Sequence, residues 1–171
     1  MSRVLRVLGQ RRTAYLPLGL ILLGAAGLAL GFGPGARRLV AEFRPDADFA
    51  YAFATGILLL GSIAVQWRLY LARRSRDGRR IRREYLVHRW AGIGPLALLI
   101  LHMGGPQATL MSVMGYALLG SSFAGLFNQE ILPIRAEKGR ALWLAIHVGL
   151  AAFIIPLALV HAWAVLAFRV N

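Results

Sequence analysis

The chain has 171 residues, of which 58% are hydrophobic, and 20 Lys and Arg against 7 Asp and Glu give it a formal net charge of +13. This apolar fraction exceeds the roughly 45–50% of soluble domains and argues against a soluble globular domain. The absence of cysteine excludes a disulfide-rich secreted module, iron–sulfur clusters, thiolate zinc sites and covalent c-type haem. We expect one compact membrane domain over residues 1–171, without room for a soluble catalytic domain.

Five apolar runs follow one another along the chain, at residues 14–32, 49–71, 85–103, 109–127 and 141–168. As helices, all five can cross a hydrocarbon core of about 30 Å at about 1.5 Å per residue. In lipid, a single segment can satisfy the hydrogen bonds of its own backbone only as a helix. The alternative, a closed barrel, is not indicated, because the period-2 alternation of barrel strands is missing. The sequence therefore predicts an all-α membrane protein with five transmembrane helices. The first run is longer than a signal-peptide core, so we expect it to remain as an anchor.

The basic residues alternate between the segments that flank these runs. The N-terminal tail, the loop after the second run and the loop after the fourth run carry fourteen Lys and Arg, whereas the other three segments carry four. Because cytoplasmic segments are enriched in Lys and Arg, the pattern predicts a cytoplasmic N-terminus and a periplasmic C-terminus in a bacterial inner membrane.

The densest basic segment is residues 73–83, which holds seven arginines. Its simplest interpretation is a topology determinant that rests on anionic lipid headgroups. A docking surface for an acidic partner is compatible with that role. Nucleic acid is not expected as a partner, because no aromatic residues interleave with the arginines.

The four histidines form two pairs with identical spacing. His88 and His102 lie in the third run, His147 and His161 lie in the fifth, and 14 positions separate the members of each pair. In a helix this spacing rises about 21 Å and ends about 40° short of four full turns, so each pair shares one face. The third and fifth helices run in the same direction. His88 should therefore be level with His147 near the cytoplasm, and His102 level with His161 near the outer surface.

Two imidazoles facing each other at each of two levels are the axial ligands that six-coordinate b-type haem requires. The sequence thus predicts two haem b groups in an apolar helical bundle, with small residues between the histidines and prolines that kink both haem helices. The small residues are Gly92, Gly94, Gly149, Ala151 and Ala152, and the prolines are Pro95 and Pro156. Candidate propionate contacts are Arg82, Arg83, Arg89 and Arg140 on the cytoplasmic side, and Arg37, Arg38, Arg44 and Arg169 on the outer side.

Two other interpretations stay open. The histidines could serve a metal-ion transporter, although membrane metal sites usually recruit Asp, Glu or Cys and no acidic residue lies deep in any run. Alternatively, the chain could be a haem-free helical scaffold subunit of a membrane complex with incidental histidines. Gly115, Gly120 and Gly125 are typical of helix packing, and Trp90, Trp143 and Trp163 of interfacial anchors.

The paired histidines with 13 intervening residues resemble two known arrangements: the cytochrome b of quinol-oxidising bc-type complexes and the ferric reductase-like transmembrane domain. The latter includes NADPH oxidases, ferric reductases and the haem-bearing membrane subunit of bacterial periplasmic methionine sulfoxide reductase. In that family the third and fifth of six helices hold the haems, and the stretches HRWAG from His88 and KGRALWLAIH up to His147 look like it. The resemblance covers residues 85–168.

The chain departs from both arrangements. From these 171 residues we expect no sixth helix and no C-terminal flavin or nicotinamide domain, and they contain no quinol-site motif of the PEWY kind. We therefore expect an electron-transfer subunit of an oxidoreductase, with no catalytic residues of its own and substrate chemistry left to a partner. Its donor would be quinol, which would add a quinone cofactor, or a cytoplasmic flavoprotein. A periplasmic redox protein would accept the electrons, or the flow would run in reverse.

Overall fold

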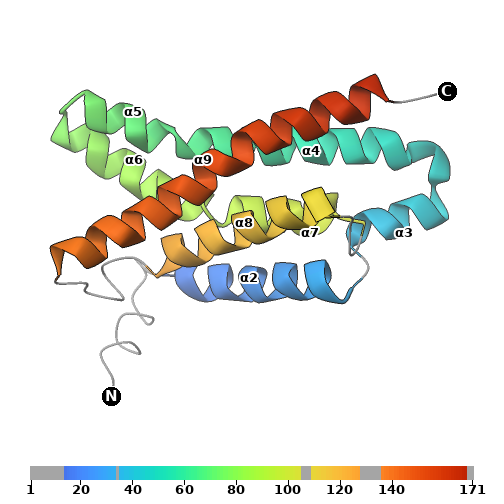
Figure 1. Cartoon of the computed structure of the whole chain (residues 1–171), viewed down its shortest axis with the longest axis horizontal. Coiled ribbons are helices and arrows are strands. Elements are labelled where there is room, and N and C mark those ends of the chain that lie inside the picture. Colours follow the sequence, from blue (N-terminus) through green and yellow to red (C-terminus); the bar gives the residue numbers. More distant parts are fainter. Residues whose placement is uncertain (1–13, 34, 105–108, 128–135, 169–171) are drawn as a thin grey trace, which may run out of the picture.

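The computed structural model describes residues 14–33, 35–104, 109–127 and 136–168 (Figure 1). All regular elements in these ranges are helical, which confirms the predicted all-α class for this part of the chain. The helices are α2 (Tyr15–Gly31), α3 (Ala36–Phe43), α4 (Asp48–Gln66), α5 (Arg68–Arg74), α6 (Gly78–Ala91), α7 (Gly94–His102), α8 (Thr109–Leu126) and α9 (Glu137–Ala167), with a 3₁₀ turn at Pro45–Ala47.

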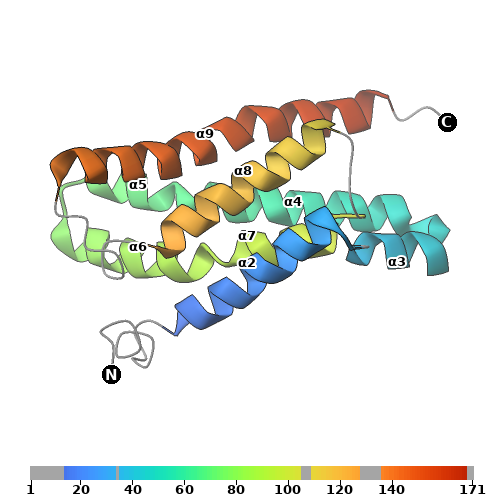
Figure 2. The same ribbon diagram turned by 60° about the horizontal axis from the view of Figure 1, so that its bottom comes forward.

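The long helices lie roughly side by side, and apart from α8 with α9 the closely packed long helices are not neighbours in sequence (Figures 1 and 2). Helix α9 packs along α8, α4 packs along α7, and α2 lies against both α7 and α8. The main core is apolar and includes Ala26, Leu96, Leu118 and Ile154. Helix α9 contributes little to it, because Ile154 is the one residue of α9 that is buried.

Two helical segments are long and apolar enough to cross a membrane, Pro45–Arg74 with 30 residues and Glu137–Ala167 with 31. A third candidate is formed if α2 and α3, which meet at a bend of 56°, are one crossing. By length and composition, the described residues therefore contain fewer candidate membrane crossings than the five that the sequence predicts. The run at 109–127 gives only a shorter apolar helix, Leu110–Leu126.

The run predicted at 85–103 is divided between α6 and α7. Pro95 lies in the first turn of α7, where its missing N–H costs nothing, whereas inside a helix its ring would clash with a carbonyl one turn earlier. Gly92 and Ile93 nevertheless keep right-handed helical dihedrals, so α7 follows on directly from α6. Pro156, by contrast, lies inside α9 and does not end it.

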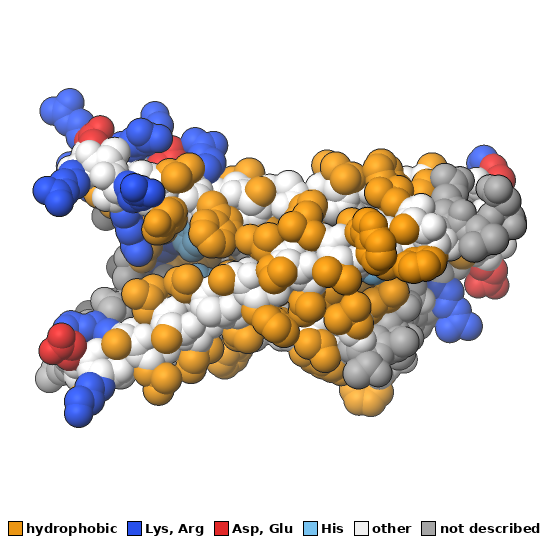
Figure 3. All heavy atoms as spheres, turned by 45° about the horizontal axis from the view of Figure 1, so that its top comes forward, with side chains coloured by type: hydrophobic (Ala, Val, Ile, Leu, Met, Phe, Trp, Pro, Cys, Tyr) orange, Lys and Arg blue, Asp and Glu red, His pale blue; other side chains and the backbone are white. Residues whose placement is uncertain are grey.

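The two ends of the molecule differ in charge (Figure 3). The turn between α5 and α6 carries the arginines of the 73–83 segment, and Figure 3 shows them gathered at one end. At the other end Arg37 and Arg44 pair with Asp48 and Asp46. The arginines of the N-terminal tail, Arg135 and Arg169 lie outside the described residues.

Glu84 connects the two helices of the basic turn. Its carboxylate is 3% exposed and accepts hydrogen bonds from Arg68 at 3.0 Å and Arg83 at 3.2 Å. The hydrogen bond from Arg68, assisted by Arg83, lowers the pKa of Glu84 below its ordinary 4.5 against the opposing effect of desolvation. The stabilisation of the fold by these two ion pairs is therefore complete at pH values above 4.5, the ordinary pKa. It is lost as the pH falls through the lowered pKa of Glu84.

We expect Glu84→Gln to lower the melting temperature of the purified protein by a few degrees at pH 7. A neutral amide keeps the shape of the side chain but loses the charge that both guanidinium groups bind. The difference from the wild type should shrink as the pH falls below about 4.5, where the carboxylate of the unfolded wild-type chain begins to take up a proton, and it should vanish below the lowered pKa of the folded protein. Thermal melts of both proteins in detergent, from pH 7 to below about pH 4.5, check this prediction. A difference in melting temperature that does not change with pH would contradict the role given to the ion pairs of Glu84.

Candidate haem-binding histidine pairs

The first histidine pair joins α6 to α9 near the arginine-rich end. His88 lies in the last turn of α6, and its imidazole faces that of His147 with ring centres 6.1 Å apart and planes at 86°. Figure 3 shows histidine side chains in a hollow between the arginine-rich end and the start of α9. This hollow is a cavity whose walls come from α2 and α4 to α9 and include both imidazoles.

The second pair joins α7 to α9 toward the other end. His102 is the last residue of α7, and its ring centre lies 6.4 Å from that of His161, with the planes at 79°. The structure thus brings each histidine beside the partner that helix geometry predicts. All four side chains are half-buried.

The distance between the two ring centres of each histidine pair is the distance required when one metal ion is bound between two imidazoles. Two metal–nitrogen bonds of about 2.0–2.1 Å in line, plus about 1 Å from each nitrogen to its ring centre, give roughly 6 Å. The backbones leave room as well, because α9 packs along α8 and makes at most sparse contact with α6 and α7. Added Cβ atoms at Gly94 and Gly149 would meet nothing within 4 Å, but neither glycine lines the cavity, whereas Gly92 lines it and an added Cβ there would lie 2.9 Å from the carbonyl oxygen of His88.

His147 is held in place by α8 and by its own helix. Its Nδ1 lies 2.9 Å from the carbonyl oxygen of Ser121, and the Ser121 hydroxyl donates to the carbonyl of His147 at 3.1 Å. The Trp143 ring stacks on the imidazole with centres 5.8 Å apart, and its Nε1 donates to Ala124 on α8. Trp143 is therefore part of the site as well as a candidate interfacial anchor.

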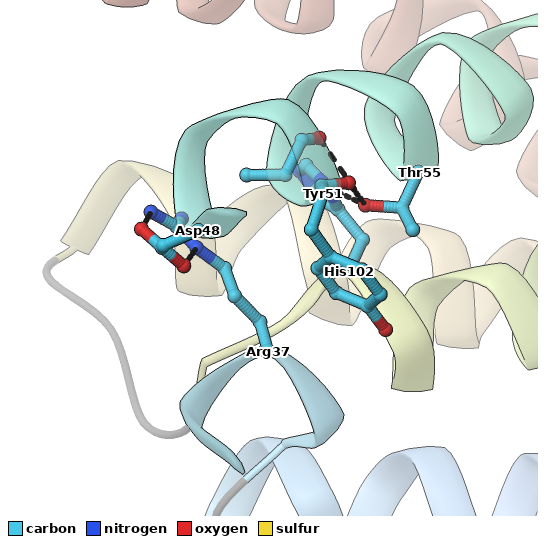
Figure 4. A network of polar contacts seen from close by, with 6 residues as sticks. Arg37, Asp48, Tyr51, Thr55 and His102 are labelled. Atoms are coloured by element: carbon cyan, nitrogen blue, oxygen red, sulfur yellow. Dashed lines mark hydrogen bonds and ion pairs between the residues drawn. The ribbon is translucent and has the colours of Figure 1, made fainter. Parts of the chain in front are cut away.

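His102 is held by α4 (Figure 4). Its Nδ1 lies 3.1 Å from the hydroxyl of Thr55, which in turn is 2.8 Å from the carbonyl oxygen of Tyr51. The Tyr51 hydroxyl donates to the carbonyl of Leu101, one residue before His102. Figure 4 shows the Thr55 side chain between the Tyr51 carbonyl and the imidazole.

A glycine lies against each of these two rings. A Cβ added to Gly56 on α4 would come within 3.0 Å of His102 Cε1, and one added to Gly125 on α8 within 2.9 Å of His147 Cε1. Such distances are too short for carbon atoms, so any side chain there would displace the imidazole. Sequence reasoning attributed Gly125 to helix packing and missed Gly56, Thr55 and Ser121, since their position beside a ring depends on helix rotation.

His88 has a different environment. Its Nδ1 is buried without a hydrogen-bond partner, as is Oε1 of Gln66, which also lines the cavity. Buried polar atoms without partners are costly and rare in native proteins. Both atoms lie where a cofactor or water would be bound.

The predicted propionate arginines are distributed unevenly. Arg89 lines the cavity, where its Nε donates to Tyr15 at 3.0 Å and its guanidinium lies over the rings of Tyr15 and Tyr85. Arg73, which sequence reasoning did not select, lines it as well. The cavity lining does not include Arg82, Arg83 or Arg140, and all three side chains are exposed.

The outer-side arginines also differ from one another. Arg37 makes a two-pronged ion pair with Asp48, at 2.9 and 2.8 Å, and Arg44 does the same with Asp46 at the surface. Both guanidinium groups therefore already have carboxylate partners. Arg38 is exposed, and Arg169 lies outside the described residues.

The described residues include no group of three or more His, Asp or Glu side chains arranged to hold a metal ion. Each pair thus offers two nitrogens. A free zinc ion requires about four ligands, whereas haem iron receives four from the porphyrin and needs two more. The donor set fits haem.

No protein-family model, curated protein or solved structure matches this chain.

Proposed function

We propose that this chain is a membrane-embedded cytochrome b that carries electrons across the bilayer through two b-type haems. The observation that carries the proposal is the double juxtaposition of His88 with His147 and of His102 with His161, each at the spacing of one bridging metal ion. Every histidine of the chain takes part. A chance arrangement has no reason to repeat the same spacing at two levels.

Each residue of the site has a simple role in this proposal. His88 and His147 would ligate one haem iron, and His102 and His161 the other. When bound, such a haem supplies one-electron transfer at an iron that stays six-coordinate. Arg89 and Arg73 line the cavity of the first site and offer positive charge to propionates. Apolar walls keep water from the ligands and thereby influence the redox potential.

The membrane arrangement is part of the proposal. We infer five crossings, in which residues 85–103 of α6 and α7 form the third and α8 the fourth. The arginine-rich end of α5 and α6 would face the cytoplasm of a bacterial cell, with the N-terminus on that side and the C-terminus in the periplasm. The His88–His147 site would then be the cytoplasmic one, and electrons would pass between the two surfaces by way of both sites.

The partners follow from this placement. Quinol or a cytoplasmic flavoprotein would exchange electrons with the His88–His147 site, and a periplasmic redox protein with the other, in either direction. The chain would act as the electron-transfer subunit of an oxidoreductase, because the described site contains ligands and a sheath but no group placed to transform a substrate.

The test is a dithionite-reduced minus oxidised spectrum of the purified protein, together with haem quantified per chain. We expect a b-type α band and two haems per chain. A purified, folded chain without that band overturns the proposal. Bound zinc or copper with no haem would instead favour the transporter interpretation, and neither would favour a helical scaffold subunit.

A further inference from the structure

The described part of the chain has three buried polar side chains, Thr55, Ser121 and Glu84. Glu84 stabilises the basic turn, but Thr55 and Ser121 both contact a histidine of the proposed sites. We propose that the Thr55 hydroxyl is a positioning group that sets the protonation and orientation of His102 and thereby tunes the redox potential of its site. The inference rests on the proposed function and deepens it.

The contacts of the Thr55 hydroxyl favour one arrangement of hydrogen atoms. The hydroxyl has one hydrogen, which it donates to the backbone of α4, where the carbonyl oxygens of Tyr51 and Ala52 lie 2.8 and 3.2 Å away. Its oxygen is then left to accept from His102 Nδ1 at 3.1 Å, and this is the arrangement that the proposal assigns. The neutral imidazole then carries its hydrogen on Nδ1, which leaves Nε2 as the nitrogen that can bind iron.

The equivalent bond at His147 has a different origin. Its Nδ1 donates to a carbonyl, that of Ser121 at 2.9 Å, which is backbone and survives any substitution. The Ser121 hydroxyl lies 3.5 Å from the same nitrogen and donates instead to the carbonyl of His147. One histidine thus depends on a side chain for its orientation, whereas the other depends on the main chain.

This asymmetry has a consequence for electron transfer. A partner that accepts the Nδ1 hydrogen makes the imidazole a more basic ligand and stabilises the oxidised metal. Removing the acceptor should therefore raise the midpoint potential of the site. Because the Thr55 bond is made only to His102, the change should be confined to the haem of the His102–His161 pair.

Three variants test this inference: Thr55→Val, which keeps the shape but removes the acceptor, Thr55→Ser, which restores it, and Ser62→Ala as the matched control. The Ser62 hydroxyl also donates to a backbone carbonyl of α4, but it makes no hydrogen bond to a histidine in the described part of the chain. We expect Thr55→Val to raise the midpoint potential of one haem by about 59 mV, equal to a tenfold loss of preference for ferric iron. Retention of that haem should weaken by about 10–100-fold. The other haem should keep its potential, Thr55→Ser should resemble the wild type, and Ser62→Ala should change neither potential.

The readouts are haem per chain and a spectrally monitored redox titration of both haems. Unchanged potentials in a Thr55→Val protein that holds two haems would overturn the inference while leaving the proposed function intact. A shift of the same size in Ser62→Ala would overturn it too. A wild-type chain without haem would instead refute the proposed function. Thr55→Ala replaces Thr55→Val if the valine protein does not fold, and retention of the other haem then reports on folding.

Discussion

Replacing His88 with alanine is expected to abolish the same haem as replacing His147, and to leave the other haem in place. Each variant removes one of the two histidines proposed to ligate one iron, and in this open, half-buried site we expect the single remaining histidine not to retain that haem through purification. Haem per chain should fall from two to one, with half of the α-band absorbance lost. The reduced-minus-oxidised spectra of the two variants should match each other.

The same reasoning applies to His102 and His161, whose variants should share the complementary spectrum. Ile146→Ala and Leu101→Ala are matched controls, because each lies next to a ligand on the same helix but is 47% or 42% exposed on another face. Both control proteins should keep two haems. Loss of different haems in His88→Ala and His147→Ala would refute the pairing, even if the wild type binds two.

Valine at Gly56 or Gly125 should displace a ligand without removing it. The added Cβ would lie within 3.0 Å of His102 Cε1 in the first variant and within 2.9 Å of His147 Cε1 in the second, so the ring must rotate or shift. The ring must give way by a few tenths of an ångström to the added Cβ alone and by more to the two γ-methyl groups of valine, which breaks a metal–nitrogen bond whose length is fixed within about 0.2 Å. Gly56→Val should therefore lose the haem of the His102–His161 pair, and Gly125→Val the other.

Gly61→Val is the control for this pair of variants. Gly61 lies on α4, the helix of Gly56, and an added Cβ there would meet nothing within 4 Å. That protein should retain two haems and the melting temperature of the wild type. If Gly61→Val lost as much haem as Gly56→Val, the effect would belong to the helix and not to the contact with the ring. Haem quantification and spectra of the three proteins distinguish these results.

Much of the fold could be predicted from local patterns, but the points at which the helices end could not. The apolar runs locate the helices, because burial in lipid requires about 20 consecutive apolar residues. The run at 85–103 nevertheless contains Pro95, which begins a new helix, and the run at 14–32 leads into α3 through a bend of 56°. A helix can end because one backbone N–H is missing, as it is in proline. A hydropathy pattern does not contain that information.

The arginines show a similar division. The overall distribution of charge was readable from the chain, since it follows from which segments carry Lys and Arg. The chain did not show which arginines line the cavity. Arg89 lines it as predicted, the exposed Arg82 does not, and the exposed Arg73 lines it although the pattern did not select it. A long side chain can reach several places, and its partner is decided by neighbours such as Glu84, which already binds Arg83.

The sequence by itself determined which histidines can share a level, because helical rise and turn per residue are set by local hydrogen bonds and do not vary with context. The tertiary structure decided how the rings are held. Thr55 and Gly56 meet His102, and Ser121 and Gly125 meet His147, only because α4 packs along α7 and α8 along α9 in one rotation. Helix rotation is a balance of many weak side-chain contacts, and that balance is not visible in any one segment of the chain.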